Sequence, residues 1–370
     1  MRRARSSGKV RKRELPAKDL LPVVSVFCGC GGLDLGFRKA GFQPILAIDT
    51  DEIACMTYEQ NHPGVRVLKQ DLSSAPKGYV LDRLAELPRM KRPVGVIGGP
   101  PCQAFSLSNR NGGARDARAK LPRNYAAVLK DLASAFDLDF FVFENVPGLR
   151  YKEHSALFGV FKKLFASAGF SIFEGELDAQ DFGVPQVRKR IFVVGFNKAK
   201  YPRLDFEFPS GLARTKRTVE DAIGSLREPK YFKHGLSATD IPVHPNHWCM
   251  RPRSKKFFNG YLKEGDSKGR PFRVLQWHKP SWTVAYGHRE VHIHPSGRRR
   301  LSVYEAMLLQ GFPSSYKLLG TLSDQIRLVS DAVPPPLAKA LAEAVLEATK
   351  HGKQLRRKKP ARRAPSQARA

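Results

Sequence analysis

The stretch that decides the fold is Leu21-Pro-Val-Val-Ser-Val-Phe27, followed directly by Cys28-Gly-Cys-Gly-Gly-Leu-Asp-Leu-Gly36. The first part is an apolar run typical of a buried strand, and the second is a glycine loop that leads into a helix through about Ala40. A strand, a glycine loop and a helix in this order favour a nucleotide-type ligand, because glycine lets a ligand approach the backbone. Taken alone, this pattern is a weak signal.

Further apolar runs alternate with helical segments, such as the one at residues 51–60, and predict an α/β fold. We expect a mostly parallel sheet with helices on both faces, closed by an antiparallel edge. A last helix is expected at 336–345 and should pack back on this first domain. The predicted strands lie at residues 21–27, 45–48, 65–68, 94–97, 140–143, 171–177 and 190–196.

The chain is strongly basic, with 64 Lys and Arg against 34 Asp and Glu and a net charge of +30. Such a charge predicts a polyanionic partner. Residues 1–13 hold seven basic side chains and residues 353–370 hold eight, with no acid in either segment. These two segments together carry half of the net positive charge, and the rest of the chain carries the other half. We expect both ends to be disordered and to bind phosphate without reading sequence; solvated tails are the alternative.

Neither a membrane span nor a secretory signal is predicted, because no apolar run approaches the roughly 20 residues that cross a bilayer. The five cysteines form no disulfide framework, which suits a reducing compartment. We therefore expect a cytoplasmic protein. We also expect it to be nucleoid-associated and monomeric. No metal is expected, because two histidine-rich sets lack structural-zinc spacing: His244, His247 and Cys249, and His288, His292 and His294.

One cysteine, Cys102, follows two prolines at the end of a predicted strand, in Gly98-Gly-Pro-Pro-Cys-Gln-Ala-Phe-Ser106. Open α/β sheets bind ligands at the carboxyl ends of their strands, so this position predicts a nucleophile held in place. A small buried cysteine without chemistry is the alternative. Glu144 also ends an apolar strand, where desolvation should raise its pKa and let it donate a proton, unless it only caps the next helix.

Other polar residues are expected at the same edge of the sheet. Arg188 and Arg190 lie on one side of an extended segment, where they could fix an anion or orient Glu144, or form only a basic strand edge. Asp49 and Asp71 end two strands and are placed to accept from a ribose hydroxyl and an adenine amino group; strand-end caps are the alternative. The basic segment 103–125 predicts a mobile lid over a polyanion, or else a disordered insertion.

Together these pieces resemble the DNA cytosine-5 methyltransferases that depend on S-adenosylmethionine. The resemblance covers most of residues 22–347. It rests on ordered motifs: Phe27-Cys-Gly-Cys-Gly-Gly32, Pro100-Pro-Cys-Gln-Ala-Phe-Ser106, Glu144-Asn-Val146, Gln186-Val-Arg-Lys-Arg190, Leu309-Gln-Gly-Phe-Pro313 and Ala332-Val-Pro-Pro335.

The resemblance implies a Rossmann-like class I methyltransferase fold with a smaller target-recognition domain. It implies that Cys102 attacks C6 of a flipped cytosine while Glu144 hydrogen-bonds to N3, with Arg188 and Arg190 completing the catalytic set. The implied cofactor-binding residues are Phe27, Gly29, Gly31, Gly32, Asp49, Asp71, Pro101, Asp331 and Val333, and the implied DNA-binding residues are Ser106, Ser108, Arg110 and Gln186.

The domain boundaries follow from the same comparison and from the loss of periodicity after about Lys200. We expect a basic leader at 1–20, a catalytic and cofactor-binding domain at 21–202 plus 314–350, a target-recognition domain with its return segment at 203–313, and a basic tail at 351–370. Double-stranded DNA is the expected partner, and a restriction endonuclease acting on the same site could accompany it.

Several positions depart from the family pattern. Ser25 and Asp49 stand where the family commonly has Asp and Glu, Tyr304 replaces an Arg, and Ser330-Asp331 replaces Gly-Asn. An aspartate near the cofactor's carboxylate should repel it unless the aspartate is protonated or displaced. Three other functions are weighed against DNA methylation: RNA cytosine methylation on the same fold, DNA binding without catalysis, and a nicotinamide oxidoreductase, which Asp34 in the glycine loop disfavours.

Overall fold

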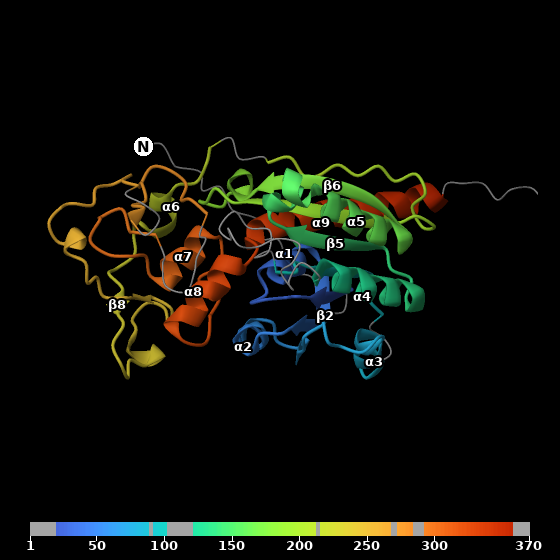
Figure 1. The fold of residues 1–370 in the computed structure, drawn as a ribbon, viewed down its shortest axis with the longest axis horizontal. Helices are drawn as coiled ribbons and strands as arrows, with labels where there is room; N and C mark the ends of the chain where they lie inside the picture. The colour runs from blue at the N-terminus through green and yellow to red at the C-terminus, as the bar shows by residue number, and fades with distance from the viewer. Residues whose placement is uncertain are drawn as a thin grey trace, which may run out of the picture.

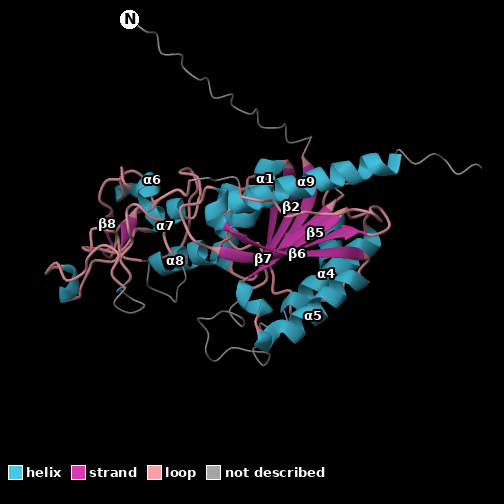
Figure 2. Ribbon diagram, turned by 90° about the horizontal axis from the view of Figure 1, so that it is seen from above, coloured by secondary structure: helices cyan, strands magenta, loops and turns pink. Residues whose placement is uncertain are grey.

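The computed structural model describes residues 20–88, 92–101, 121–211, 215–267, 272–283 and 292–357. Its centre is a seven-stranded sheet in the order β3-β2-β1-β4-β5-β7-β6. This sheet confirms the predicted α/β fold, and Figure 2 shows its twisted strands between two layers of helices. The strands are β1 (Leu21–Val26), β2 (Phe42–Asp49), β3 (Arg66–Lys69), β4 (Gly95–Gly98), β5 (Phe140–Asn145), β6 (Phe170–Asp178) and β7 (Lys189–Asn197).

Strands β1 to β5 are all parallel, and β7 is the antiparallel strand. It lies between β5 and β6, so the β6 and β7 pair forms the antiparallel edge that the sequence predicted. The reason is the long antiparallel pairing between β6 and β7, which extends from Phe170 opposite Asn197 to Asp178 opposite Lys189. Because β7 then pairs with β5 on its other side, β6 becomes the edge strand and the start of β7 is brought beside the end of β5.

Each face of the sheet is covered by its own group of helices (Figure 2). On one face, α1 (Gly32–Ala40) packs against the long helix α9 (Pro335–Arg357), and Phe37, Leu337 and Leu341 are fully buried there. The other face is covered by α3 (Tyr79–Ala85), α4 (Leu121–Ala135) and α5 (Lys152–Ser167). Helix α2 (Glu52–Asn61) follows β2 and packs near the end of β1 through Tyr58.

The segment after β7 forms a smaller unit beside the sheet domain (Figure 1). It contains few regular elements, so side-chain packing and short capped turns determine its shape. A shared core joins it to the two helices that return to the sheet domain, with Val219, Leu275 and Met307 fully or almost fully buried. Its elements are α6 (Val219–Ile223), β8 (Lys230–Tyr231), η5 (Ala238–Asp240), β9 (Trp248–Cys249) and η6 (Lys255–Phe257), followed by α7 (Val303–Leu309) and α8 (Leu322–Asp331).

A buried ion pair fixes the return segment. Arg299 forms a bidentate pair with Glu305 in α7, with Nη1 and Nη2 donating over 2.9 Å each. Both side chains are almost fully buried, so removing one of them would leave the other as an unpaired buried charge and would strongly lower the stability of the fold. The pair therefore holds the start of α7 against the smaller unit.

Within the described ranges, no helix has the length and apolarity that a membrane crossing requires. The cysteines that the structure describes, Cys28, Cys30, Cys55 and Cys249, are all buried free thiols. Burial raises the pKa of Cys30 to about 12, so this thiol stays protonated and unreactive near neutral pH.

Candidate active site

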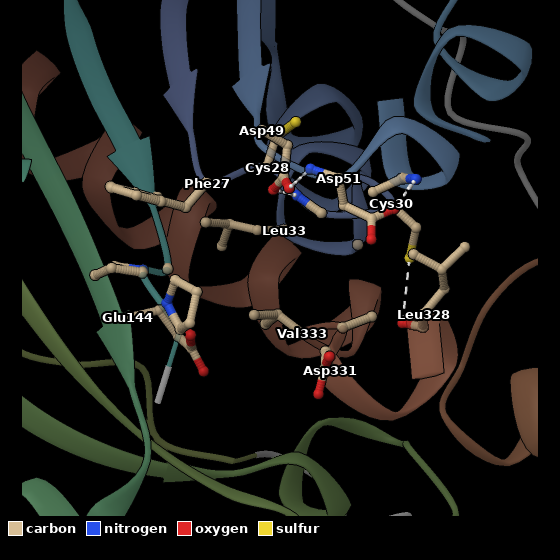
Figure 3. A pocket seen from close by; sticks show the side chains of 18 of the residues that line it. Phe27, Cys28, Cys30, Leu33, Asp49, Asp51, Glu144, Leu328, Asp331 and Val333 are labelled. Atoms are coloured by element: carbon tan, nitrogen blue, oxygen red, sulfur yellow. Dashed lines mark hydrogen bonds between the residues drawn. The ribbon is translucent and has the colours of Figure 1, made fainter. Parts of the chain in front are cut away.

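A cavity of about 260 Å³ opens at the carboxyl ends of β1, β2, β4 and β5. Helix α8 and the turn after it form its other wall (Figure 3). This is the edge at which the strand ends were expected to gather their polar residues. Nine of the residues that the sequence assigned to the site line it: Phe27, Gly29, Gly32, Asp49, Pro101, Glu144, Arg190, Asp331 and Val333.

The glycine loop forms the floor of the cavity by repeatedly using left-handed backbone. Phe27 has φ +55°, which is strained for a residue with a side chain, and Gly29 has φ +54°. A Cβ at Gly29 would meet no protein atom within 4 Å. Because Gly29 lines the cavity, a side chain at this position would take up part of the cavity's volume. A Cβ at Gly32 would lie 2.4 Å from the Val333 carbonyl oxygen, so only glycine lets α1 begin against this turn.

Asp49 is held in place by the loop that it faces. Its Oδ2 accepts from the Gly29 amide at 2.8 Å, and its Oδ1 accepts from the Asp51 amide at 3.0 Å. Burial nevertheless raises the pKa of the carboxyl above its ordinary value. The Asp49 carboxylate therefore has a fixed position at the cavity wall, as binding of a ligand's hydroxyl groups requires.

Glu144 and Arg190 form a nearly buried ion pair at the cavity wall, next to Gly99. Arg190 Nε lies 2.9 Å from Glu144 Oε1, and the two side chains are 10% and 9% exposed. Burial raises the pKa of Glu144, while the charges of Arg190 and Arg188 oppose that rise. A Cβ at Gly99 would lie 2.6 Å from Glu144 Oε2, so glycine at this position leaves room for the carboxyl.

Arg188 supports the site without lining the cavity. Its fully buried guanidinium donates through Nη2 to the carbonyl oxygens of Ser330, at 2.6 Å, and Ala332, at 2.9 Å. These two carbonyls flank Asp331. Arg188 and Arg190 thus act on different parts of one site, since Arg188 holds the turn after α8 and Arg190 holds Glu144.

Some predicted site residues are not at the cavity. Asp71 is exposed and caps a turn, with its Oδ1 accepting from the Ser73 amide at 2.8 Å. Gly31 has φ +86° and precedes α1, but it faces His62 rather than the cavity. Gln186 is fully buried, so its DNA contact stays a prediction. Cys102, Ser106, Ser108 and Arg110 lie outside the described residues.

Several residues that line the cavity were not predicted from the sequence. Asp34, Asp51 and Arg327 are charged and belong to helices whose first or last turns reach the site. Helical spacing alone offered a signal for Arg327, since it lies one turn before Asp331 on α8. Asn145 was quoted in a motif but not assigned a role; its side-chain amide donates to the Pro100 carbonyl at 3.3 Å and so ties the end of β5 to the segment that precedes Cys102.

Known proteins are similar to this chain over most of its length. The family model for the C-5 cytosine-specific DNA methylases matches residues 21–347. The chain is 35% identical to the Type II methyltransferase M.MthTI of Methanothermobacter thermautotrophicus, over 88% of this chain and 97% of that protein. It is 33% identical to M.FnuDI of Fusobacterium nucleatum, over 88% and 94% of the two chains.

Solved structures support the fold. A prophage-encoded protein of E. coli superimposes with a TM-score of 0.71 at 23% identity, covering 89% of this chain and 99% of that one. The Entamoeba histolytica methyltransferase EhMeth gives a TM-score of 0.62 at 16% identity, covering 89% and 98%. Fold, ordered motifs and relatives agree, and the chain belongs to the C-5 cytosine-specific DNA methylases.

Proposed function

We propose that this chain methylates C5 of a cytosine that is flipped out of a short, specific duplex DNA sequence, with S-adenosylmethionine as the methyl donor and Cys102 as the nucleophile. Membership of the family supports cytosine methylation in DNA. The observation that carries the finer proposal is the buried Glu144 and Arg190 pair at the wall of a cavity that also includes Pro101, the residue before Cys102.

The cavity fits S-adenosylmethionine in its chemistry. This cofactor carries two cationic groups and one carboxylate, and the cavity wall includes the carboxyl groups of Asp34, Asp49, Asp51, Glu144 and Asp331 against the cations of Arg190 and Arg327. When bound, the cofactor supplies the methyl group. Phe27, Gly29, Gly32, Pro101 and Val333 would surround it, Asp49 would accept from its ribose hydroxyls, and Asp71 remains a proposed partner for its adenine.

Cys102 would add through its thiolate to C6 of the cytosine, which makes C5 able to take the methyl group. Loss of the C5 proton then expels the thiolate and restores the ring. A free thiol has a pKa of about 8.5, so the positive charge of the Arg190 region would favour the reactive thiolate. C5 and C6 cannot be reached from both faces inside a stacked duplex, so the target base must leave the helix.

Glu144 would stabilise the addition by a hydrogen bond to N3 of the cytosine. Its burial favours the protonated carboxyl, which can donate to N3, and the Arg190 ion pair fixes the orientation of that carboxyl. The charges of Arg190 and Arg188 oppose the rise in its pKa, and burial is the larger of these effects.

The partner that we propose is double-stranded DNA, read by the smaller unit at residues 203–313 and held by the basic surface of a chain with net charge +30. Ser106, Ser108, Arg110 and Gln186 are the proposed contacts outside that unit. Because M.MthTI and M.FnuDI are named Type II methyltransferases, we also propose a role in restriction and modification, alongside an endonuclease that cleaves the same unmethylated site.

The test uses duplex DNA in which 5-fluorocytosine replaces cytosine at the methylated site, once that site has been mapped by sequencing DNA from cells that express the protein. Fluorine at C5 cannot leave as the proton does, so the protein should remain covalently attached when S-adenosylmethionine is added. Cys102→Ser should form no adduct, whereas Cys249→Ser, which changes a buried thiol in the smaller unit, should form it normally. An undiminished adduct in Cys102→Ser would refute the proposed nucleophile.

A further inference from the structure

Helices α7 and α8 lie between the smaller unit and the sheet domain (Figures 1 and 2). The segment that connects these helices contains a short stretch, residues 317–319, that is bonded to both parts of the molecule. In the sheet domain, Asn61 at the end of α2 donates through Nδ2 to the Lys317 carbonyl oxygen at 2.7 Å and accepts from the Lys317 amide at 2.9 Å. Thr57 on the same helix accepts from the Leu319 amide at 3.1 Å.

The smaller unit bonds to the same stretch through Asn246. This side chain donates through Nδ2 to the Leu318 carbonyl oxygen at 2.8 Å, and its Oδ1 accepts from the Leu318 amide at 2.9 Å. The main-chain carbonyl oxygen of Asn246 accepts from the Tyr304 amide in α7 at 2.8 Å. Asn246 is only 1% exposed, so water cannot replace a bond that is lost here. Two asparagines from two parts of the molecule thus clamp adjacent peptide groups of one stretch.

A second polar contact joins the smaller unit to α8. Trp248 Nε1 donates to Gln325 Oε1 at 2.7 Å, and Gln325 Nε2 donates in turn to the Gly320 carbonyl oxygen at 3.1 Å. The side chains of Trp248 and Gln325 are both buried, within the apolar core that the two parts share. Apolar contacts have no preferred direction, whereas hydrogen bonds do. The contacts of Asn246 and Trp248 therefore determine how the smaller unit is oriented.

The two helices that these bonds reach also line the cavity. Asp51 and Ala54 lie at the start of α2, and Leu328 lies near the end of α8. We propose that Asn246 and Trp248 are positioning residues for methyl transfer, which hold the smaller unit in one orientation relative to the cavity, so that a correctly read duplex presents its cytosine there. This inference rests on the proposed function, which assigns DNA reading to the smaller unit.

The proposal predicts a particular kind of defect. Methyl transfer requires precise placement of the reacting atoms, and a misplacement of about 1 Å can lower a rate by about 10²-fold. The target duplex has to satisfy the smaller unit and the cavity together, so a loosened orientation should slow its methylation. A duplex that is read poorly gains little from the correct orientation, and its slow methylation should change less. Loss of discrimination between the two duplexes is therefore expected, rather than an equal loss of activity on both.

The test measures single-turnover methylation by the full chain of two duplexes: the mapped target, and the same duplex with one recognised base pair altered. In Asn246→Ala, the ratio of the two rates should fall by about 10-fold, because the target is methylated more slowly. Trp248→Phe keeps an aromatic ring but removes the N–H donor, and it should lower the ratio in the same direction. Asn197→Ala is the matched control. Asn197 also bonds to two main-chain groups, those of Leu138 and Ala199, but it lies in the sheet domain, and its loss should leave the ratio unchanged.

An unchanged ratio in Asn246→Ala and Trp248→Phe would overturn the inference. An equal fall in Asn197→Ala would overturn it as well, because the effect would then follow from lower stability alone. Thermal unfolding shows which variants are folded, and the milder change, Trp248→Phe, decides the question if Asn246→Ala does not fold. If the unaltered chain methylates no DNA, the proposed function fails instead.

A double variant tests whether the two asparagines act together. Asn61→Ala should lower the ratio by itself, since it releases the same stretch from the sheet domain. Asn61→Ala combined with Asn246→Ala should lower it little further than Asn246→Ala alone, because the stretch is already released. Losses that simply add would show that the two side chains act independently, and would contradict a shared positioning role.

Discussion

At the scale of single residues, Glu144 combines a buried carboxyl with one fixed cationic partner, Arg190. We predict that Glu144→Gln lowers the rate of methyl transfer by about 10²- to 10⁴-fold, because the amide keeps the shape but cannot exchange a proton. Single-turnover methylation of a mapped duplex measures this rate. Glu174→Gln on β6 removes a glutamate that pairs with Arg150 and Lys162 away from the cavity, and it should keep the normal rate. A normal rate in Glu144→Gln would exclude the proposed acid.

Buried histidines give a second prediction at this scale. Burial lowers the pKa of His292 to about 4, and neutral His292 is therefore favoured in the fold. The unfolded chain binds a proton near pH 6.5 and the folded chain only near pH 4, so this residue's contribution to stability is lost as pH falls through that window. Urea unfolding at several pH values should show a smaller loss between pH 7 and pH 4.5 in His292→Gln than in the unaltered chain.

The pH dependence of stability must be compared between His292→Gln and the unaltered chain, because buried acids change that dependence in the opposite direction. Burial raises the pKa of Asp34 to about 6, and such a group favours the fold more as pH falls. The difference between the two pH curves isolates His292. An equal pH dependence in both proteins would show that this histidine is already protonated, or exposed, in the fold.

At the scale of elements, Arg188 joins the start of β7 to the turn that follows α8. We predict that Arg188→Met lowers the free energy of unfolding by about 2–4 kcal/mol, because two buried carbonyl groups lose their donor. Cofactor affinity should fall as well, since the turn carries Asp331 and Val333. Arg150→Met is the matched control: its partly exposed ion pair with Glu174 should contribute less than about 1 kcal/mol. Equal losses in the two variants would contradict a special role for Arg188.

The sequence predicted the sheet elements well because their signals are local. Apolar runs that end in Gly, Asp or Glu marked the strands, and those strand ends placed Asp49 and Glu144 at one cavity as expected. The position of β7 inside the sheet could not be predicted, since pairing with both β5 and β6 is a long-range property. Asp71 also follows a strand end, but the turn after β3 directs its side chain to solvent, and its contact with the cofactor's adenine stays a prediction.

The site residues that lie at helix ends were harder to predict from the sequence than those at strand ends. Asp34 and Arg327 reach the cavity only because α1 and α8 meet there, which depends on packing between segments far apart in the sequence. Tyr58 donates to Asp34 Oδ1 at 2.9 Å and orients this carboxyl from α2. No motif spacing contains that information. The predicted residues at Cys102, Ser106, Ser108 and Arg110 lie outside the described residues, and their roles stay predictions.

At the scale of the whole molecule, the net charge of +30 makes electrostatic attraction to DNA the dominant long-range force. The C-terminal basic segment was expected to begin at residue 353. Lys353 instead pairs with the buried Asp139 at 2.7 Å, and α9 continues to Arg357. A deletion that tests the segment without disturbing the fold should therefore begin at residue 358.

Deleting residues 358–370 removes five basic side chains, those of Lys358, Lys359, Arg362, Arg363 and Arg369, and no acidic one. We predict that DNA binding weakens equally for target and non-target duplexes, and that the plot of log affinity against log salt becomes shallower by up to about 4, since each phosphate contact contributes about 0.9 to the slope. A chain of unchanged length with these five residues replaced by Gln should behave like the deletion, because charge rather than length is responsible. The set of methylated sites should stay the same in both. A changed target sequence, or a loss of affinity confined to the target duplex, would show that this segment reads bases rather than phosphates.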